Sequence, residues 1–594
     1  MAINRFDKDE ELRERDFSYG AMARRYLLPH MGKFALVIAI MFVVALLELL
    51  PAYFISVVLD ICVPQKNYKL IIVLGASLFV ANIIILFCTK YRAIFANETA
   101  MQIIKNVRSD LFAHMQKLPF AFFDSRPHGK ILVRIVNYVN TISGLLSSGI
   151  LDMIMNIFKL IVTIGFMFAL NVKFTLICLA GIPVFAVFII IMNKQHDKAW
   201  KKYSAKQSNM NAYIQESISG MKITQSFARE EKNSEIFDGL CNDTKKHWME
   251  AVIISNMNPR FVELLSTLIL ILVYYIGANA VGGGVMKVGA VIAFASCVSR
   301  FWSPIQSITT VYNSIINCAA YIERIFEMMH EPLVIEDLPG AEDIGEIRGD
   351  VSYKNVTFAY NAESPNIFEN VSFDVKSGES IALVGPTGAG KSTIINLLAR
   401  FYNIREGEIT IDGKNIRQAT LKSIRSQMGI MLQDSILFSG TIADNIRYGK
   451  LDATDEEVIK AAEAVCAHDF IKELPDGYNT VVSEGGASLS AGQKQLISFA
   501  RTLLANPKIL ILDEATSSID TETELVLQRA LERLLEGRTS FIIAHRLSTI
   551  KNSSRIMYIA DKGIAEAGTH DELLALGGRY AELYAAQYKF LEQL

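Results

Sequence analysis

The pattern of apolar and polar positions divides the chain into two parts near residue 330. Before this point, long segments of Ile, Leu, Val, Phe and Met alternate with charged connections. After it, short β-rich runs are separated by Gly, Asn and Asp turns, and strands then alternate with helical stretches. The pattern predicts a polytopic α-helical membrane domain over residues 1–330, a linker over 331–349 and an α/β domain over 350–594.

Six of the apolar segments are long enough to cross a membrane as helices, which takes roughly 20 apolar residues for about 30 Å of hydrocarbon. Arg24 and Arg25 precede the first span, and Lys90 and Arg92 follow the second. By the positive-inside rule, we expect a multi-pass protein of the cytoplasmic membrane with both termini in the cytoplasm. The predicted spans lie at about 34–58, 70–89, 145–170, 174–192, 261–281 and 288–308.

Two long connections, between spans two and three and between spans four and five, are charged and helical in pattern. Residues 93–118 and 200–227 are rich in helix formers and nearly free of Pro and Gly, so we expect them to extend the spans into the cytoplasm. Turns are predicted at 119–129 and near 216–220. The aromatic residues at the first turn need a surface to bury against.

Composition supports a membrane protein and argues against several other classes. Of the 594 residues, 51% are hydrophobic and only 20% are charged, and the mean hydropathy of +0.28 is too high for an ordinary soluble enzyme. The formal charge is −2, so no global field recruits nucleic acid. Seven cysteines without a CxxC pair argue against a disulfide framework or a structural zinc site.

The strongest chemical signal is a complete G-x-x-x-x-G-K-S motif between Gly385 and Ser392, after an apolar strand and before a helical run. Its glycines let backbone N–H groups surround phosphate oxygens at a helix N-terminus, Lys391 adds a positive charge, and the Ser392 hydroxyl suits Mg²⁺. A chance glycine-rich turn is the alternative, which the flanking strand and helix disfavour. The residues expected to hold ATP here are Gly385, Thr387, Gly388, Ala389, Gly390, Lys391, Ser392 and Thr393.

A second signal is the apolar run 509–512, which ends in Asp513 and Glu514. Adjacent acids at an interior strand end are costly unless a cation and a reacting water use them. Asp513 suits the Mg²⁺ shell, directly or through water, and Glu514 suits the general base that polarises the attacking water. A solvated strand end is the alternative for this pair alone. Together, the two motifs predict a nucleoside triphosphatase.

The segment 489–493, Leu-Ser-Ala-Gly-Gln, resembles the Leu-Ser-Gly-Gly-Gln signature of ATP-binding cassette (ABC) transporters. The resemblance implies that Ser490, Gly492 and Gln493 contact ATP. The departure at Ala491 leaves less room than Gly, but a methyl group fits if the local φ is negative. We therefore expect slower turnover at most.

Other landmarks of the family occur in the right order through the same domain. The resemblance implies that Tyr360 stacks on adenine, that Gln433 lies between Mg²⁺, water and the membrane domain, and that His545 contacts the γ-phosphate as a catalytic residue beside Glu514. The implied metal ligands are Ser392, Gln433 and Asp513. Each residue alone is a weak signal, since a lone Tyr, Gln or His is more often core or surface.

Six spans ahead of one cassette resemble the half-transporters of the type IV exporter fold, which export drugs, lipids or peptides. In that family, the signature of one cassette closes over the P-loop nucleotide of another, so one copy of each motif implies two chains. The resemblance favours a homodimer, with a related half-transporter as the alternative partner. It also implies that residues 120–126 and about 211–227 act as coupling helices that carry ATP-driven movement to the membrane.

The substrate is less constrained than the ATP site. Glu48, Lys159 and Arg300 lie near the middle of predicted spans, where an unpaired charge costs at least about 2.5 to 3.5 kcal/mol. One hypothesis is a cavity with positive excess for anionic or amphipathic molecules; the other is that Glu48 pairs with one of the bases to fix helix packing. An exporter of small amphipathic or peptide substrates, in contact with membrane lipid, is the favoured reading, with an ATP-gated channel or regulator and an importer as alternatives.

Overall fold

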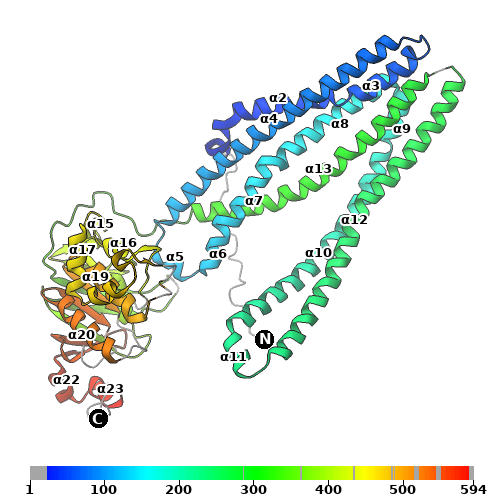
Figure 1. Cartoon of the computed structure of the whole chain (residues 1–594). Helices are drawn as coiled ribbons and strands as arrows, with labels where there is room; N and C mark the ends of the chain where they lie inside the picture. Colours follow the sequence, from blue (N-terminus) through cyan, green and yellow to red (C-terminus); the bar gives the residue numbers. More distant parts are fainter. Residues whose placement is uncertain are drawn as a thin grey trace. The chain divides into compact units, whose positions relative to one another are not determined.

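The structure is a computed structural model that describes residues 23–284, 286–361, 364–431, 435–482, 486, 489–513, 521–543 and 550–587 (Figure 1). Its contacts separate two units. The helical unit comprises residues 1–116 and 129–330, and the α/β unit comprises residues 117–128 and 331–594. The short segment 117–128 therefore belongs with the α/β unit although it lies between two membrane helices in the sequence.

The helical unit contains six helical stretches that are long and apolar enough to cross a membrane: 24–62, 68–115, 128–170, 172–219, 230–282 and 288–308. Each predicted span lies inside one of them, so the predicted polytopic membrane domain is confirmed. The elements are η1 (Ala23–Leu27), η2 (Leu28–His30), α2 (Met31–Leu47), α3 (Leu50–Val57), η3 (Val58–Cys62), α4 (Tyr68–Met115), α6 (His128–Val133), η4 (Arg134–Tyr138), α7 (Val139–Gly144), η5 (Leu145–Gly149), α8 (Ile150–Leu170), α9 (Val172–Leu179), α10 (Gly181–Ser219), α11 (Met221–Ser226), α12 (Glu230–Gly282) and α13 (Val288–Met329).

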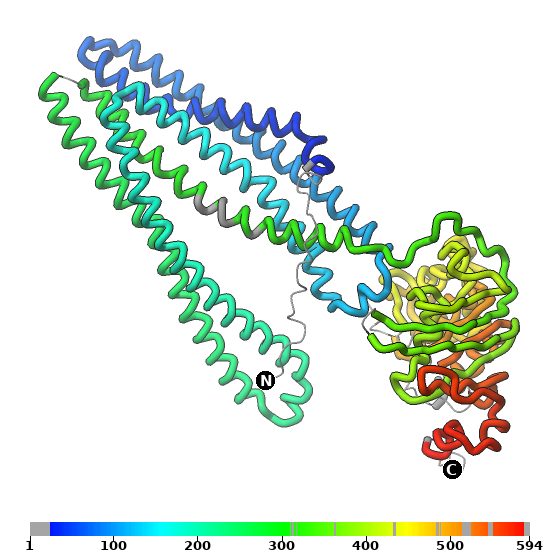
Figure 2. Tube along the Cα trace, turned by 180° about the vertical axis from the view of Figure 1, so that it is seen from behind, coloured from blue at the N-terminus to red at the C-terminus, as the bar shows by residue number. Residues whose placement is uncertain are grey.

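Several helices continue well beyond the hydrocarbon, as the sequence predicts. The helix α4 runs on to Met115 without interruption, and α10 and α12 lie side by side as an antiparallel pair (Figure 2). At the tip of this pair, α10 ends before Gly220, the short helix α11 follows, and Ala228 adopts a left-handed φ of 49° before α12 begins. The predicted turn near 216–220 therefore coincides with the end of α10.

The membrane helices pack around buried aromatic residues and close approaches at glycine. Trp302 of α13 is 2% exposed and meets Phe185 of α10 edge to face, with 5.8 Å between the ring centroids. A Cβ atom at Gly277 of α12 would lie 2.6 Å from Cγ1 of Val291 on α13, so the helices approach closely because that side chain is absent. On the outward side, Ile72 and Phe79 of α4 are 72% and 70% exposed, as expected for lipid-facing positions.

The α/β unit contains two larger sheets. A six-stranded sheet has the order β12-β11-β3-β10-β9-β6, in which β12 alone is antiparallel, and a four-stranded antiparallel sheet has the order β2-β1-β4-β5. Their strands are β1 (Val351–Phe358), β2 (Phe368–Val375), β3 (Ser380–Val384), β4 (Glu406–Ile411), β5 (Lys414–Asn415), β6 (Met428–Met431), β9 (Ile509–Asp513), β10 (Thr539–Ile543), β11 (Arg555–Ala560) and β12 (Gly563–Gly568).

Helices and a short two-stranded sheet complete the α/β unit. The helix α14 follows β3 and packs near β10, and α16, α17 and α20 surround α19. The elements are α5 (Phe120–Asp124), α14 (Lys391–Leu398), α15 (Leu421–Arg425), β7 (Gly440–Thr441), α16 (Ile442–Arg447), α17 (Asp455–Ala464), α18 (His468–Glu473), η6 (Gly477–Asn479), β8 (Val481–Val482), α19 (Ala491–Ala505), α20 (Thr521–Leu535), α22 (His570–Leu576) and α23 (Arg579–Gln587).

The segment 331–349, expected as a linker, is attached to the α/β unit by burial and hydrogen bonds. Ile344 and Ile347 are buried in the core shared by the two larger sheets. The buried Arg400 guanidinium donates to the carbonyl oxygens of Glu336 and Ala419, at 2.8 Å each, and so holds this segment against the body of the unit. The segment packs as part of the domain that follows it.

The close approach at Gly277 generates a stability prediction. We expect Gly277→Ala to lower the free energy of unfolding by about 1–3 kcal/mol, and with it the melting temperature, because the added methyl must displace Val291 or separate α12 from α13. Gly75→Ala on α4 is the matched control, since its Cβ would meet nothing within 4 Å. Thermal unfolding followed by fluorescence-detected size exclusion measures both variants. Equal stability of the two would contradict close packing at Gly277.

Candidate functional site

The candidate site lies where four neighbouring parallel strands end. In the order β3-β10-β9-β6, each strand runs parallel to the next, so their carboxyl ends meet at the same edge of the sheet. The predicted phosphate loop follows β3, and Asp513 is the last residue of β9. Glu514, His545 and Gln433 lie outside the described residues. In the sequence, they come one or two positions after the ends of β9, β10 and β6.

The loop between β3 and α14 has a backbone that requires glycine. Gly385, Gly388 and Gly390 have φ values of 143°, 83° and 105°, in the region that L side chains rarely adopt. A Cβ atom at Gly385 would lie 2.4 Å from the carbonyl oxygen of Ile559, and one at Gly390 would lie 2.8 Å from Phe368 Cζ. The predicted residues 385–393 are thus brought together in one tight turn at the start of α14, where free backbone N–H groups favour an anion.

Lys391 reaches back across this turn. Its Nζ donates hydrogen bonds to the carbonyl oxygens of Gly385 at 2.8 Å and Pro386 at 2.9 Å. Burial lowers the pKa of the Lys391 ammonium below its ordinary value, while the Asp513 carboxylate opposes this shift. The Lys391 ammonium and the Asp513 carboxylate therefore interact electrostatically.

Tyr360 is fixed beside the start of α14. Its hydroxyl and the Oγ1 atom of the buried Thr393 are 2.8 Å apart in a hydrogen bond. Phe358 and Tyr402 meet its ring edge to face, each with 5.0 Å between centroids. Tyr360 remains 40% exposed, so part of its side chain is accessible to a ligand.

The same aromatic group contacts α5, the short helix at the tip of the first long hairpin. Tyr402 donates a hydrogen bond of 2.7 Å to the Asp124 carboxylate, and Phe120 stacks on Phe401 with 5.3 Å between centroids. Phe122 is 3% exposed, whereas Phe120 remains 39% exposed, so the aromatic tip is buried in part. A continuous chain of contacts thus runs from Thr393 through Tyr360 and Tyr402 to Asp124.

Sequence reasoning missed Tyr402, and it placed Asp124 within the predicted coupling helix 120–126 without assigning it a contact. They are 278 positions apart, and neither belongs to a spaced motif. Burial and the hydrogen bond to Asp124 raise the pKa of the Tyr402 hydroxyl well above its ordinary value, so it remains a donor at neutral pH. The only sequence signal was an unusual density of aromatic residues at residues 120–123 and 401–402.

The signature segment forms the start of α19. Ser490 is the N-cap, its hydroxyl accepts from the Gln493 N–H at 3.2 Å, and the Gln493 side chain accepts from the Ser490 N–H at 2.9 Å. Ala491 is the first helical residue and is absent from the residues with positive φ, so its methyl group fits without strain. Among the described residues, no hydrogen bond or ion pair joins 490–493 to 385–393.

The charges predicted within the spans converge on Glu48. Lys159 Nζ lies 2.8 Å from the Glu48 carboxylate, and Arg300 donates to the Glu48 carbonyl oxygen at 2.7 Å. The hypothesis that Glu48 pairs with one of the bases is therefore confirmed. Glu48 and Lys159 also line a cavity together with a second ion pair, Arg92 to Asp152, so the described side chains that line this cavity carry no positive excess. Two carboxylates balance two cations there.

Comparison with known proteins agrees with both halves of the chain. Residues 34–305 match the family model described as ABC transporter transmembrane region, and residues 368–517 match the one described as ABC transporter. The uncharacterized ABC transporter ATP-binding protein YknV of Bacillus subtilis (strain 168) is 41% identical over 534 residues, which cover 89% of this chain and 88% of that protein. An ATP-dependent lipid A-core flippase of Desulfotalea psychrophila is 36% identical over 556 residues, covering 92% and 95%.

A solved structure gives the same result for the fold. A bacterial Atm1-family ABC exporter with ATP bound matches with a TM-score of 0.76 and 27% identity, covering 96% of this chain and 99% of that one. Six membrane-spanning helices and a phosphate-loop α/β domain thus agree with the similarity along nearly the whole chain. This chain belongs to the ABC transporter family, as a multi-pass membrane protein whose ATP-binding domain hydrolyses ATP to power transport.

Proposed function

We propose that this chain exports apolar and amphipathic molecules across the cytoplasmic membrane as a homodimer, with both termini in the cytoplasm. The observation that carries the proposal is that the phosphate loop after β3 and Asp513 at the end of β9 lie at the same edge of the sheet, with β10 between them, in a chain with six candidate spans. The printed functions of relatives, lipid A-core flippase and Atm1-family exporter, support movement of large, partly apolar molecules outward. Arg24, Arg25, Lys90 and Arg92 support the orientation.

In this proposal, the loop 385–393 holds the phosphates of ATP through backbone N–H groups and Lys391, and Tyr360 stacks on the adenine. The Ser392 hydroxyl is exposed at the start of α14 and Asp513 lies at the end of β9, so these two oxygens and Gln433 suit Mg²⁺. Bound Mg²⁺ would neutralise charge on the phosphates. Glu514 then orients and deprotonates the attacking water, and His545 stabilises the charge that develops on the γ-phosphate.

The partner follows from the signature segment. Ser490, Gly492 and Gln493 lie at the N-terminus of α19, where the helix dipole suits an anion, but no contact joins them to the phosphate loop within the described residues of one chain. A second copy supplies the missing half of each site, so that two ATP molecules are enclosed between two α/β units. A related half-transporter would satisfy the same need, which makes activity of the isolated chain the decisive observation.

Movement at the ATP site reaches the membrane through the hairpin tips. The first tip is linked to Thr393 by the contacts of Asp124, Tyr402 and Tyr360. The second tip carries three large apolar side chains, Ile218, Ile223 and Phe227, with exposed fractions of 68%, 66% and 73%. Such a patch needs a partner surface.

A surface of suitable chemistry lies on the α/β unit. Phe438 and Tyr448 pack together with 4.7 Å between centroids, and Arg501 lies 5.8 Å from each ring. Both rings remain about half exposed. We propose that this aromatic surface of one copy receives the second tip of the other copy, so that ATP-driven closure moves both hairpins.

Loss of the proposed general base should stop turnover but not assembly. We expect Glu514→Gln to lower ATPase activity in lipid vesicles by at least about hundredfold, the usual range for removing a general base, and to abolish uptake of fluorescent amphipaths into inside-out vesicles. Glu406→Gln is the control, because Glu406 is an exposed carboxylate of β4. Unchanged hydrolysis in Glu514→Gln would overturn the assignment. An inactive wild type would instead indicate that a second, different chain is required.

The exposed tip of the second hairpin gives another prediction. We expect Phe227→Asp to uncouple the protein, with substrate-stimulated ATPase reduced about tenfold, because a charge cannot enter the aromatic surface of the partner without losing roughly 1–3 kcal/mol. Leu576→Asp is the control, since Leu576 of α22 is 67% exposed and has no proposed partner. If both variants keep full stimulation, the second tip does not transmit the movement.

The geometry at the signature separates the roles of two neighbouring residues. Ala491→Gly should leave ATPase activity within about threefold of wild type, because the helical position is unstrained and a change of ~0.5 kcal/mol has only that effect on a rate. Ser490→Ala removes both the N-cap hydroxyl and the proposed contact to ATP, and it should lower ATPase activity more than tenfold. Loss of the cap alone destabilises the start of α19 by about 1 kcal/mol. The reverse order of the two effects would contradict this assignment.

A further inference from the structure

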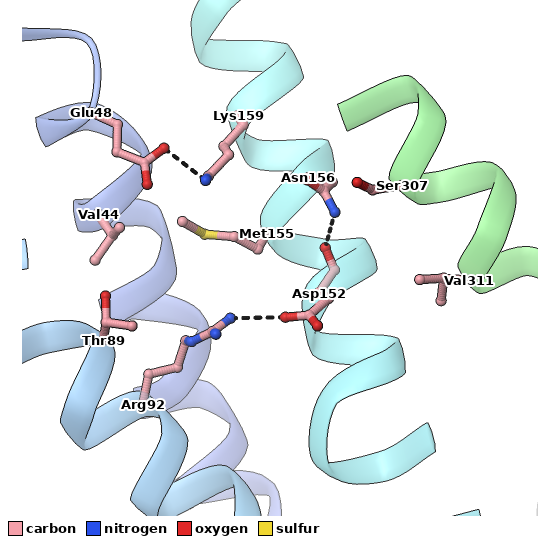
Figure 3. Close-up of a pocket in the computed structure, with 10 residues that line it drawn as sticks. All are labelled: Val44, Glu48, Thr89, Arg92, Asp152, Met155, Asn156, Lys159, Ser307 and Val311. Carbon is pink, nitrogen blue, oxygen red and sulfur yellow. Dashed lines mark hydrogen bonds and ion pairs between the residues drawn. The ribbon is translucent and has the colours of Figure 1, made fainter. Parts of the chain in front are cut away.

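The helical unit contains a cavity of about 420 Å³ between α2, α4, α8 and α13 (Figure 3). This volume lies within the range of small-molecule sites. Four charged side chains face it, Glu48, Arg92, Asp152 and Lys159, beside apolar side chains that include Val44 and Met155. All of them belong to the helical unit, so the cavity exists within a single chain.

The four charges form two ion pairs of opposite polarity along α8. Lys159 of α8 pairs with Glu48 at 2.8 Å, whereas Asp152 of α8 pairs with Arg92 of α4 at 3.2 Å. With a rise of 1.5 Å per residue, Asp152 and Lys159 are about 10 Å apart along the helix, and Asn156 lies between them on the same face. The negative side chain of Asp152 and the positive side chain of Lys159 thus face one cavity from the same helix (Figure 3).

These pairs are not sealed. The side chains of Glu48 and Lys159 are 30% and 31% exposed, and those of Asp152 and Arg92 are 46% and 24% exposed. Charges within a membrane are expensive and are retained where they serve a ligand, a relay or a structural pair. Because these four side chains line the cavity and are partly exposed, their charged atoms are accessible to a molecule inside it.

Resting on the proposed function, we propose that this cavity binds the head of the transported molecule and that this head is zwitterionic. A lone anion that displaces Glu48 from Lys159 would leave the Glu48 carboxylate uncompensated within a predicted span, and a lone cation that displaces Lys159 from Glu48 would leave the Lys159 ammonium uncompensated. A head group that carries a positive and a negative charge can pair with both members of an ion pair, so every charge remains compensated. Val44 and the flexible Met155 then contact the start of an apolar tail.

Arg300 does not alter this conclusion. Its guanidinium donates to the backbone carbonyl of Glu48, and it does not line the cavity. It anchors α13 to the end of α2 and holds the Glu48 backbone in place. The recognition chemistry therefore rests on the two balanced pairs alone.

The test compares three amphipaths that share one dodecyl tail. Equilibrium binding of dodecylphosphocholine, dodecyltrimethylammonium and dodecyl phosphate is measured on the full-length protein in nanodiscs of phosphatidylglycerol. We expect the zwitterion to bind at least about tenfold more tightly than either singly charged probe. Glu48→Gln with Lys159→Gln should abolish this preference. Equal binding of all three probes, or an anionic preference, would overturn the proposal.

Two further variants keep the result interpretable. The pair Lys206 and Asp243, at 2.7 Å on α10 and α12 outside the cavity, is the matched control, and Lys206→Gln with Asp243→Asn should retain the preference. The exchanged pair Glu48→Lys with Lys159→Glu keeps both charges and should restore zwitterion binding. If the exchanged pair folds but shows no preference while the wild type does, the site is elsewhere and the proposal fails.

A second lipid composition distinguishes two sources of the zwitterionic ligand, a membrane lipid and a free amphipath. If the natural ligand is a zwitterionic lipid, nanodiscs that contain phosphatidylethanolamine should weaken dodecylphosphocholine binding by competition in the wild type only. If the ligand is a free amphipath, binding should be the same in both nanodiscs. ATP hydrolysis by the wild-type protein is measured in parallel. Absence of hydrolysis refutes the proposed function, whereas intact hydrolysis without a preference for the zwitterionic head group refutes only the zwitterion site.

Discussion

In the proposed mechanism, the attachment of α5 to the α/β unit is the interaction on which the use of ATP depends. A hydrolytic site can move membrane helices only if a rigid element connects them, and α5 supplies it through a hydrogen bond from Tyr402 to Asp124 and a stacked pair of phenylalanines. Tyr402 also touches Tyr360, which bonds to Thr393 of the phosphate-loop helix. A shift of α14 therefore reaches the hairpin tip through three contacts, each of short range and defined direction.

A second constraint acts within the membrane, where every charge needs a partner. The helical unit meets it by pairing Glu48 with Lys159 and by placing Arg300 on a backbone carbonyl. Arg92, which follows the second predicted span, pairs with Asp152 of α8. Each of these contacts joins two different helices, so the charges also fix how α2, α4, α8 and α13 pack. The contacts that compensate the charges therefore also hold the helices together.

The sequence was informative wherever function imposes a local pattern. Apolar length predicts the spans, and the spacing between Gly385 and Ser392 predicts a turn that only glycine can form. Long-range contacts leave no such trace. Nothing in the sequence selects Lys159 over Arg300 as the partner of Glu48, because both lie at similar depth, and the balancing role of Asp152 emerges only when α4 and α8 are placed together.

The ion pairs and the hairpin tip share one continuous element. Arg92 belongs to α4, which runs without a break to Met115 and leads directly into the segment that carries α5. A zwitterionic head that takes Asp152 from Arg92 would remove an ion pair between α4 and α8, while α5 remains attached to the α/β unit by Asp124 and Phe120. Within the proposed mechanism, occupation of the cavity thus makes α4 more mobile, and α4 is also the helix that ATP-driven closure moves. Substrate binding and hydrolysis are then coupled through α4, with no need for a longer path.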